Sequence, residues 1–144
     1  MSDNNDVSSI VLVVDDDDMV RRAAVRVLAR HYRIEEFSDA ERAVARVLAG
    51  GIAAVVTDLS MPRMSGLELA RRVRAYDAGL PVVLMTASGS PQLEALALGE
   101  GISSYLAKPF EPNELLDAVE RAVSIERVVQ SERRSRPGRA RSAS

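Results

Sequence analysis

The stretch IVLVVDDDD at residues 10–18 places five consecutive apolar residues directly before four aspartates. An apolar run without polar alternation is typical of a strand buried on both faces, as in a parallel sheet covered by helices. Similar short runs recur along the chain, and segments with helical periodicity separate them. This alternation predicts an α/β fold: a doubly wound, five-stranded parallel sheet with helices on both faces. The predicted strands are 10–14, 33–37, 52–57, 81–86 and 103–107, and the predicted helices are 17–30, 40–49, 65–77, 91–99 and 111–128.

Residues that favour helix starts stand at the expected boundaries. Ser38 and Asp39 can cap the second helix, and Pro91 and Pro112 suit the first turns of the fourth and fifth helices. These signals agree with the periodicity and support the same five βα repeats.

The composition is that of a folded single domain. The chain has 144 residues, of which 47% are hydrophobic and 28% charged, so disorder and collagen-like structure are excluded as the dominant state. Without cysteine there is no disulfide, thiolate metal site or cysteine nucleophile. No apolar run approaches the roughly 20 residues needed to span a bilayer, and the polar N-terminus does not resemble a signal peptide. We therefore expect a cytoplasmic protein with no membrane partner.

The charge is unevenly distributed. Residues 129–144 carry a charge of +4 from arginine, whereas the rest of the chain carries −6. The predicted organisation is a flexible N-terminus at 1–8, one domain at 9–128 and a basic, disordered tail or linker at 129–144. A basic arm can bind nucleic acid. We favour a solvated terminus, because the five aromatic residues offer no stacking platform for bases.

The strongest functional signal is the set of side chains at the predicted strand ends. Asp15 and Asp16 follow the first strand, Asp58 the third, Thr86 ends the fourth, and Lys108 follows the fifth. Lys108 is also the only lysine among 19 basic residues. Ligands of doubly wound sheets bind outside the carboxyl ends of the strands. The sequence thus predicts one site that combines carboxylates, a hydroxyl and an ammonium group.

This donor set favours phosphoryl transfer assisted by a hard cation. Oxygen ligands alone favour Mg²⁺ or Mn²⁺ over zinc. Charge neutralisation and positioning do most of the work in phosphoryl transfer. Asp58 is then the candidate nucleophile, Lys108 neutralises a phosphoryl oxygen, and Thr86 donates a hydrogen bond to another.

Each residue also has a structural interpretation. Asp17 and Asp18 fit the start of the first helix, where its dipole favours acids, and a shift of register among the four aspartates stays open. Asp58 can cap the following loop, and Thr86 can be an ordinary strand residue. His31 suits the exposed end of the first helix better than a phosphorelay role. The combination at several strand ends favours the functional interpretation.

Four segments resemble the receiver domain of bacterial two-component response regulators: VLVVDDDD (11–18), VVTDLSMPRMSGLEL (55–69), VVLMTASG (82–89) and SSYLAKPF (103–110). The resemblance covers about residues 9–125. It implies a flavodoxin-like sheet of strand order 2-1-3-4-5. It also implies a switch in which Asp58 accepts a phosphoryl group from a sensor histidine kinase or phosphotransfer protein.

The resemblance assigns the remaining site residues. Mg²⁺ would be held by Asp15, Asp16, Asp58 and the backbone carbonyl of Ser60. The phosphoryl group would be held by Thr86, the backbone N–H of Ala87, and Lys108, with Thr86 and Tyr105 acting as the switch pair. The family often has a cis Lys–Pro bond, which Lys108–Pro109 would supply.

The last predicted helix carries an apolar stripe that continues past the usual end of a receiver. Its members are Leu115, Val119, Ala122, Ile125 and Val129. The stripe indicates either a contact, in a homodimer or toward an output domain, or an ordinary overhang. The downstream partner is accordingly a separate protein or a fused output domain, and the receiver is not a turnover enzyme.

An enzyme is the alternative. Asp16-x-Asp18-x-Val20 partly matches the DxDx(T/V) motif of haloacid-dehalogenase-like phosphatases, in which Asp16 would be the nucleophile and Asp18 the acid/base. This interpretation leaves Asp58 without a role, and no two adjacent acidic residues follow Lys108.

Overall fold

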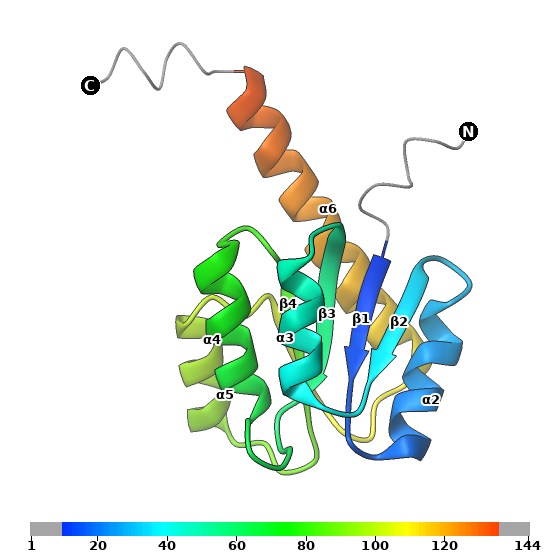
Figure 1. Cartoon of the computed structure of the whole chain (residues 1–144). Coiled ribbons are helices and arrows are strands. Elements are labelled where there is room, and N and C mark those ends of the chain that lie inside the picture. The colour runs from blue at the N-terminus through cyan, green and yellow to red at the C-terminus, as the bar shows by residue number, and fades with distance from the viewer. Residues whose placement is uncertain (1–9, 136–144) are drawn as a thin grey trace.

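The computed structural model describes residues 10–135, with side chains described for residues 10–125. Strands and helices alternate throughout, and all five strands are parallel in the order β2-β1-β3-β4-β5 (Figure 1). The predicted fold class and strand order are therefore confirmed. The elements are β1 (Ile10–Val14), α2 (Asp18–Leu28), β2 (Arg33–Phe37), α3 (Ala40–Leu48), β3 (Ile52–Asp58), α4 (Gly66–Tyr76), β4 (Val82–Thr86), α5 (Pro91–Gly99), β5 (Ser104–Ala107) and α6 (Pro112–Ser135).

Side-chain caps fix where the helices begin. Asp17 accepts hydrogen bonds from the backbone N–H groups of Met19 and Val20 at the start of α2, and Asp39 caps α3 in the same way. Pro91 occupies the first turn of α5. Asp17 and Asp39 accept hydrogen bonds from backbone N–H groups that have no partner inside the helix, and Pro91 has no backbone N–H to satisfy. The predicted roles of Asp17, Asp39 and Pro91 are confirmed.

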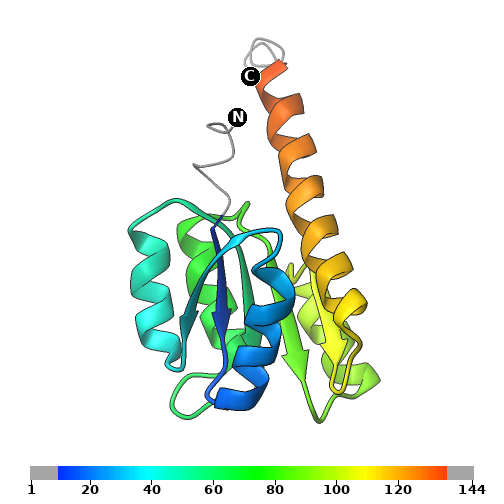
Figure 2. The same ribbon diagram turned by 90° about the vertical axis from the view of Figure 1, so that its right-hand side faces the viewer.

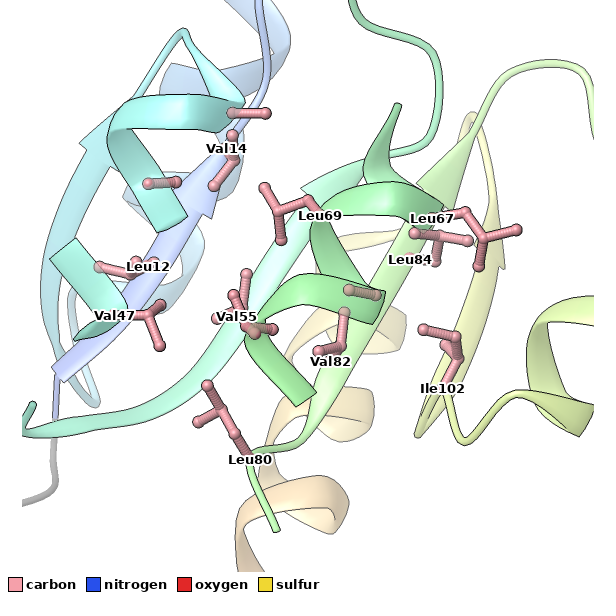
Figure 3. Close-up of a cluster of buried hydrophobic side chains, with 14 of the residues drawn as sticks. Leu12, Val14, Val47, Val55, Leu67, Leu69, Leu80, Val82, Leu84 and Ile102 are labelled. Carbon is pink, nitrogen blue, oxygen red and sulfur yellow. The ribbon is translucent and has the colours of Figure 1, made fainter. Parts of the chain in front are cut away.

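The sheet separates two apolar cores. One lies under α3, α4 and α5, and Figure 3 shows its side chains, among them Leu12, Val55 and Leu84, between these helices and the strands. The other lies under α2 and α6 and contains Val13, Val56 and Leu115. The central strands β1, β3 and β4 are buried on both sides, as the continuous apolar runs predicted. This packing fixes the carboxyl ends of the strands relative to one another.

The last helix is longer than predicted. The backbone of α6 is helical to Ser135, so the end predicted at 128 was too early, and residues 129–135 belong to α6. The reason is visible in the sequence, because no glycine or proline interrupts the chain between Pro112 and Pro137. Residues 136–144 of the predicted tail and residues 1–8 of the predicted N-terminal segment lie outside the described residues.

The first half of α6 packs on the sheet and the second half extends past it. Leu115, Val119 and Ala122 are buried, whereas Ile125 is 62% exposed. Figures 1 and 2 show α6 leaving the body of the domain at the edge where the strands begin. The predicted apolar stripe is therefore buried in its first part and exposed at Ile125. The side chain of Val129 lies outside those described. Within residues 10–135 we find no helix with the length and apolar character that crossing a membrane requires.

Candidate functional site

The predicted residues meet at the carboxyl edge of the sheet. Asp15 directly follows β1, Asp58 is the last residue of β3 and Thr86 is the last residue of β4. Lys108 directly follows β5, and its backbone N–H donates to the carbonyl oxygen of Thr86 over 2.7 Å. Parallel pairing of adjacent strands brings these ends together. The residues that the sequence predicts to form one site therefore lie along one edge of the sheet.

Lys108 links two carboxylates from distant parts of the chain. Its Nζ lies 2.8 Å from Asp58 Oδ1 and 3.1 Å from Asp15 Oδ2. Both acids are buried, at 6% exposed for Asp58 and 0% for Asp15. Charge-assisted hydrogen bonds of this length in a buried setting hold the Asp58 carboxylate in one orientation.

Three carboxylates lie close enough to share one cation. Asp15, Asp16 and Asp58 each offer an oxygen within 4.8 Å of the others. Asp16 is exposed, so the cluster opens to solvent on one side. An all-oxygen donor set of this kind fits Mg²⁺ or Mn²⁺. Asp16 rather than Asp17 or Asp18 completes the cluster, which places the four-aspartate run in the predicted register.

The charges of the site perturb one another. Burial raises the pKa of Asp15, and the nearby charge of Asp58 adds to this, although the N–H of Asp17 and the Lys108 ammonium partly oppose it. Burial acts to lower the pKa of Lys108, but its hydrogen bonds and charge interactions with Asp58 and Asp15 raise it overall. The ammonium group therefore stays charged at neutral pH and offsets one of the three clustered carboxylates.

Thr86 and Tyr105 lie side by side under Gly89. A side-chain carbon at Gly89 would lie 2.5 Å from the Tyr105 hydroxyl oxygen and 3.2 Å from Thr86 Cγ2. The hydroxyl of Tyr105 is buried and has no hydrogen-bond partner among the described residues. Thr86 Oγ1 accepts a hydrogen bond from the N–H of Ser88 over 3.1 Å. The structure thus brings the predicted switch pair into contact with the same loop.

The other predicted residues border the cluster. Ser60 and Ala87 are exposed on the loops that follow β3 and β4. The Lys108–Pro109 peptide bond is cis, as the resemblance implied. His31 is exposed just after α2.

Sequence reasoning missed two residues. Gly66 begins α4 directly beneath Asp58, where any side-chain carbon would overlap the Asp58 carbonyl oxygen. Arg21 is buried and donates to the carbonyl oxygen of Asp15 over 2.9 Å. The available signal was periodicity, because Arg21 shares the inward face of α2 with Ala24 and Leu28.

Asp18 does not take part in the cluster. Its carboxylate pairs with Arg21 Nη2 over 2.7 Å in the first turn of α2. A phosphatase acid/base would have to face the nucleophile instead. This geometry removes the support for the enzyme alternative, and the comparisons with known proteins do not restore it.

Known proteins resemble the chain over most of its length. A family model described as the response regulator receiver domain matches residues 11–120. The C4-dicarboxylate transport transcriptional regulatory protein DctD of Pseudomonas aeruginosa is 34% identical over 129 residues, which are 89% of this chain and 28% of that protein. Response regulator MprA of Mycolicibacterium vanbaalenii is 38% identical over 107 residues, which are 74% of this chain and 46% of that protein. The chain therefore spans less than half the length of these curated relatives.

Solved structures agree. The chemotaxis protein CheY4 of Vibrio cholerae superimposes with a TM-score of 0.74 at 28% identity, covering 80% of this chain and 98% of that one. The family match and the strand order lead to one assignment. The chain belongs to the family of response regulator receiver domains of bacterial two-component systems.

Proposed function

We propose that this receiver domain is a phosphorylation-dependent switch whose phosphoacceptor is Asp58. The observation that carries the proposal is the Asp58 carboxylate itself, held 2.8 Å from Lys108 Nζ and within 4.8 Å of the carboxylate oxygens of Asp15 and Asp16. A nucleophile of this kind needs an adjacent cation and a fixed orientation, and the site supplies both.

In the proposed reaction an Asp58 oxygen forms a bond to phosphorus while the bond to the donor breaks. With a phosphohistidine donor, the phosphorus–nitrogen electron pair returns to the imidazole ring. Lys108 then binds a phosphoryl oxygen, and Thr86 and the backbone N–H of Ala87 hold another. The acyl phosphate carries a charge of nearly −2, about one more negative charge than the Asp58 carboxylate that it replaces, and it draws the Thr86 hydroxyl toward it and changes the packing of the neighbouring Tyr105.

The acidic cluster fits the Mg²⁺ that receiver domains typically use. Asp15, Asp16, Asp58 and the backbone carbonyl of Ser60 would hold it, and Mn²⁺ suits the same oxygen ligands. When bound, Mg²⁺ neutralises charge on the phosphoryl oxygens and the carboxylates. The exposed position of Asp16 leaves a path for the ion from solvent.

The proposed partners follow from the family. The phosphodonor is a sensor histidine kinase or a phosphotransfer protein, and the recipient of the signal is a fused output domain or a separate protein. Relatives of which the matched segment is only 28% and 46% support the fused arrangement. Receiver domains act in signalling rather than as turnover enzymes, and we place this one in the cytoplasm, where response regulators generally work. A homodimer is compatible with the exposed side chain of Ile125 on α6, and we propose no nucleic-acid contact for the receiver itself.

Phosphorylation by acetyl phosphate with Mg²⁺ tests this proposal. Wild-type protein should gain one phosphoryl group, detected by intact mass or by retardation on a phosphate-affinity gel. The label should disappear in Asp58→Asn and in the presence of EDTA. Asp18→Asn is the matched control, since it removes a nearby carboxylate that faces Arg21, and it should keep the label. Equal labelling of wild type and Asp58→Asn, or steady release of phosphate by Asp58→Asn, would contradict the proposal.

A further inference from the structure

Arg21 is a charged residue at a core position of α2. It is 8% exposed and lies on the same helix face as the buried Ala24 and Leu28. A buried guanidinium is costly unless each of its donors finds an acceptor. A residue that only supported packing at this position would be apolar, so the contacts of the guanidinium need a separate explanation.

The guanidinium connects three elements at the edge of the site. Arg21 Nη1 donates to the carbonyl oxygen of Asp15 over 2.9 Å, at the end of β1. Arg21 Nε donates to Glu36 Oε1 over 2.9 Å, on the neighbouring strand β2. The third contact, with Asp18, lies in the first turn of α2. A planar fork with fixed donor directions suits this arrangement, whereas a single ammonium does not.

The contact with the Asp15 carbonyl bears directly on the acidic cluster. That carbonyl belongs to the peptide that joins Asp15 to Asp16, two of the three clustered acids. The peptide unit is planar, so fixing its oxygen also fixes the backbone from which both side chains leave. The Asp15 N–H donates to the carbonyl of Phe37 over 3.1 Å, and Asp15 Oδ1 accepts from the Asp17 N–H over 2.9 Å. On the carbonyl side of this loop, Arg21 Nη1 is the described donor that holds the Asp15 oxygen.

We propose that Arg21 is a positioning residue for the divalent cation: it holds the Asp15–Asp16 peptide so that both carboxylates face Asp58 before the ion arrives. This inference rests on the proposed function, because it concerns the same cation site. It also explains why Glu36, a fourth carboxylate at a strand end, stays out of the cluster, since Arg21 engages it.

Charge alone predicts the opposite effect. Arg21 pairs with Asp18 and Glu36, so these three side chains together carry −1. Removing the guanidinium makes the surroundings of the cluster more negative by one charge. Coulomb attraction for Mg²⁺ should then increase. Loss of the held carbonyl should instead weaken binding, because the carboxylates are no longer pre-arranged. The sign of the change in affinity therefore separates positioning from electrostatics.

The test is titration of the full chain with MgCl₂ alone, by calorimetry, for wild type, Arg21→Met and Glu36→Gln. Arg21→Met should bind Mg²⁺ about tenfold more weakly, the range in which supporting contacts around metal ligands act. Glu36→Gln removes the ion pair but keeps the contact with the Asp15 carbonyl, so its dissociation constant should stay within about twofold of wild type. An Arg21→Met protein that is folded and binds Mg²⁺ as tightly as wild type, or more tightly, would overturn the proposal.

Two further measurements keep the result unambiguous. Circular dichroism establishes whether Arg21→Met is folded. If it is not, Arg21→Lys takes its place. Its ammonium cannot reach all three acceptors, so Mg²⁺ affinity should still fall, but by less than in Arg21→Met because one contact can remain. Acetyl phosphate labelling of wild type tests the proposed function independently. Labelled Asp58 with unchanged Mg²⁺ affinity in the Arg21 variants refutes the positioning role alone, whereas absence of Mg²⁺ binding in wild type refutes both.

Discussion

Replacement of Lys108 by methionine should destabilise the metal-free protein strongly at neutral pH. Met keeps much of the apolar stem but removes the ammonium that lies 2.8 Å from Asp58 Oδ1 and 3.1 Å from Asp15 Oδ2. Both carboxylates then stay in a buried cluster without a cation. Breaking a fully buried pair costs about 3–5 kcal/mol. Because the Lys108 side chain is 16% exposed, we expect the lower end, about 3 kcal/mol.

Urea or thermal unfolding in EDTA at pH 7 measures this cost. For a domain of this size, 3 kcal/mol corresponds to a fall of about 10 °C in Tm. Arg71→Met is the matched control, because Arg71 makes contacts of similar length with Glu100, at 2.8 and 3.0 Å, on the exposed surface. Exposed pairs contribute little, so this variant should unfold close to wild type.

The deficit of Lys108→Met should shrink under two conditions. Acidification favours the protonated form of Asp15, whose pKa burial already raises, and MgCl₂ supplies a cation in place of the ammonium. A deficit no larger than that of Arg71→Met would show that the ammonium does not compensate the cluster. If the loss of stability in Lys108→Met changes neither with acid nor with Mg²⁺, packing rather than charge causes it.

Three further predictions concern the same region. Burial raises the pKa of Asp15 in the folded protein. The protonated form therefore contributes stability below the unfolded pKa of about 3.9, and this stability is lost as the pH rises through the folded pKa. Asp15→Asn should accordingly flatten the decline in the unfolding free energy of the metal-free protein above pH 4. Gly66→Ala should lower the free energy of urea unfolding by more than about 2 kcal/mol, because its methyl group would overlap the Asp58 carbonyl. Gly99 faces open space, so Gly99→Ala should be neutral. Equal effects of the two substitutions would contradict the close approach at Gly66. Tyr105→Phe should raise the unfolding free energy by about 1 kcal/mol, because it removes a buried hydroxyl that has no hydrogen-bond partner among the described residues. A loss of stability would show instead that this hydroxyl makes a hydrogen bond.

The sequence predicted the site well because two simple rules determine it. Continuous apolar runs mark strands that are buried on both faces, and parallel strands bring their carboxyl ends to one edge. Asp15, Asp58, Thr86 and Lys108 therefore had to be neighbours once the strands were located. The assignment of Asp16 to the cluster was also predictable, since Asp17 is a good N-cap and its side chain is used at the helix start.

Other features depend on tertiary contacts that the sequence pattern indicates only in part. Arg21 was overlooked because arginine on a helix is usually exposed, and its burial depends on acceptors from β1 and β2. The end of α6 was placed too early because the apolar stripe fades near residue 129, although the following residues are good helix formers. The environment of Gly66 follows from the path of the loop between β3 and α4.

The root of α6 lies four residues after Lys108, while its far end projects past the other edge of the sheet. At 1.5 Å per residue, its 24 residues span about 36 Å. If α6 tilted by about 5° about its start, together with the part of the core that packs on it, its far end would move by roughly 3 Å, which is enough to make or break a hydrogen bond. A small rearrangement around Lys108 would thus produce a larger displacement at the far end of α6, away from the acidic cluster.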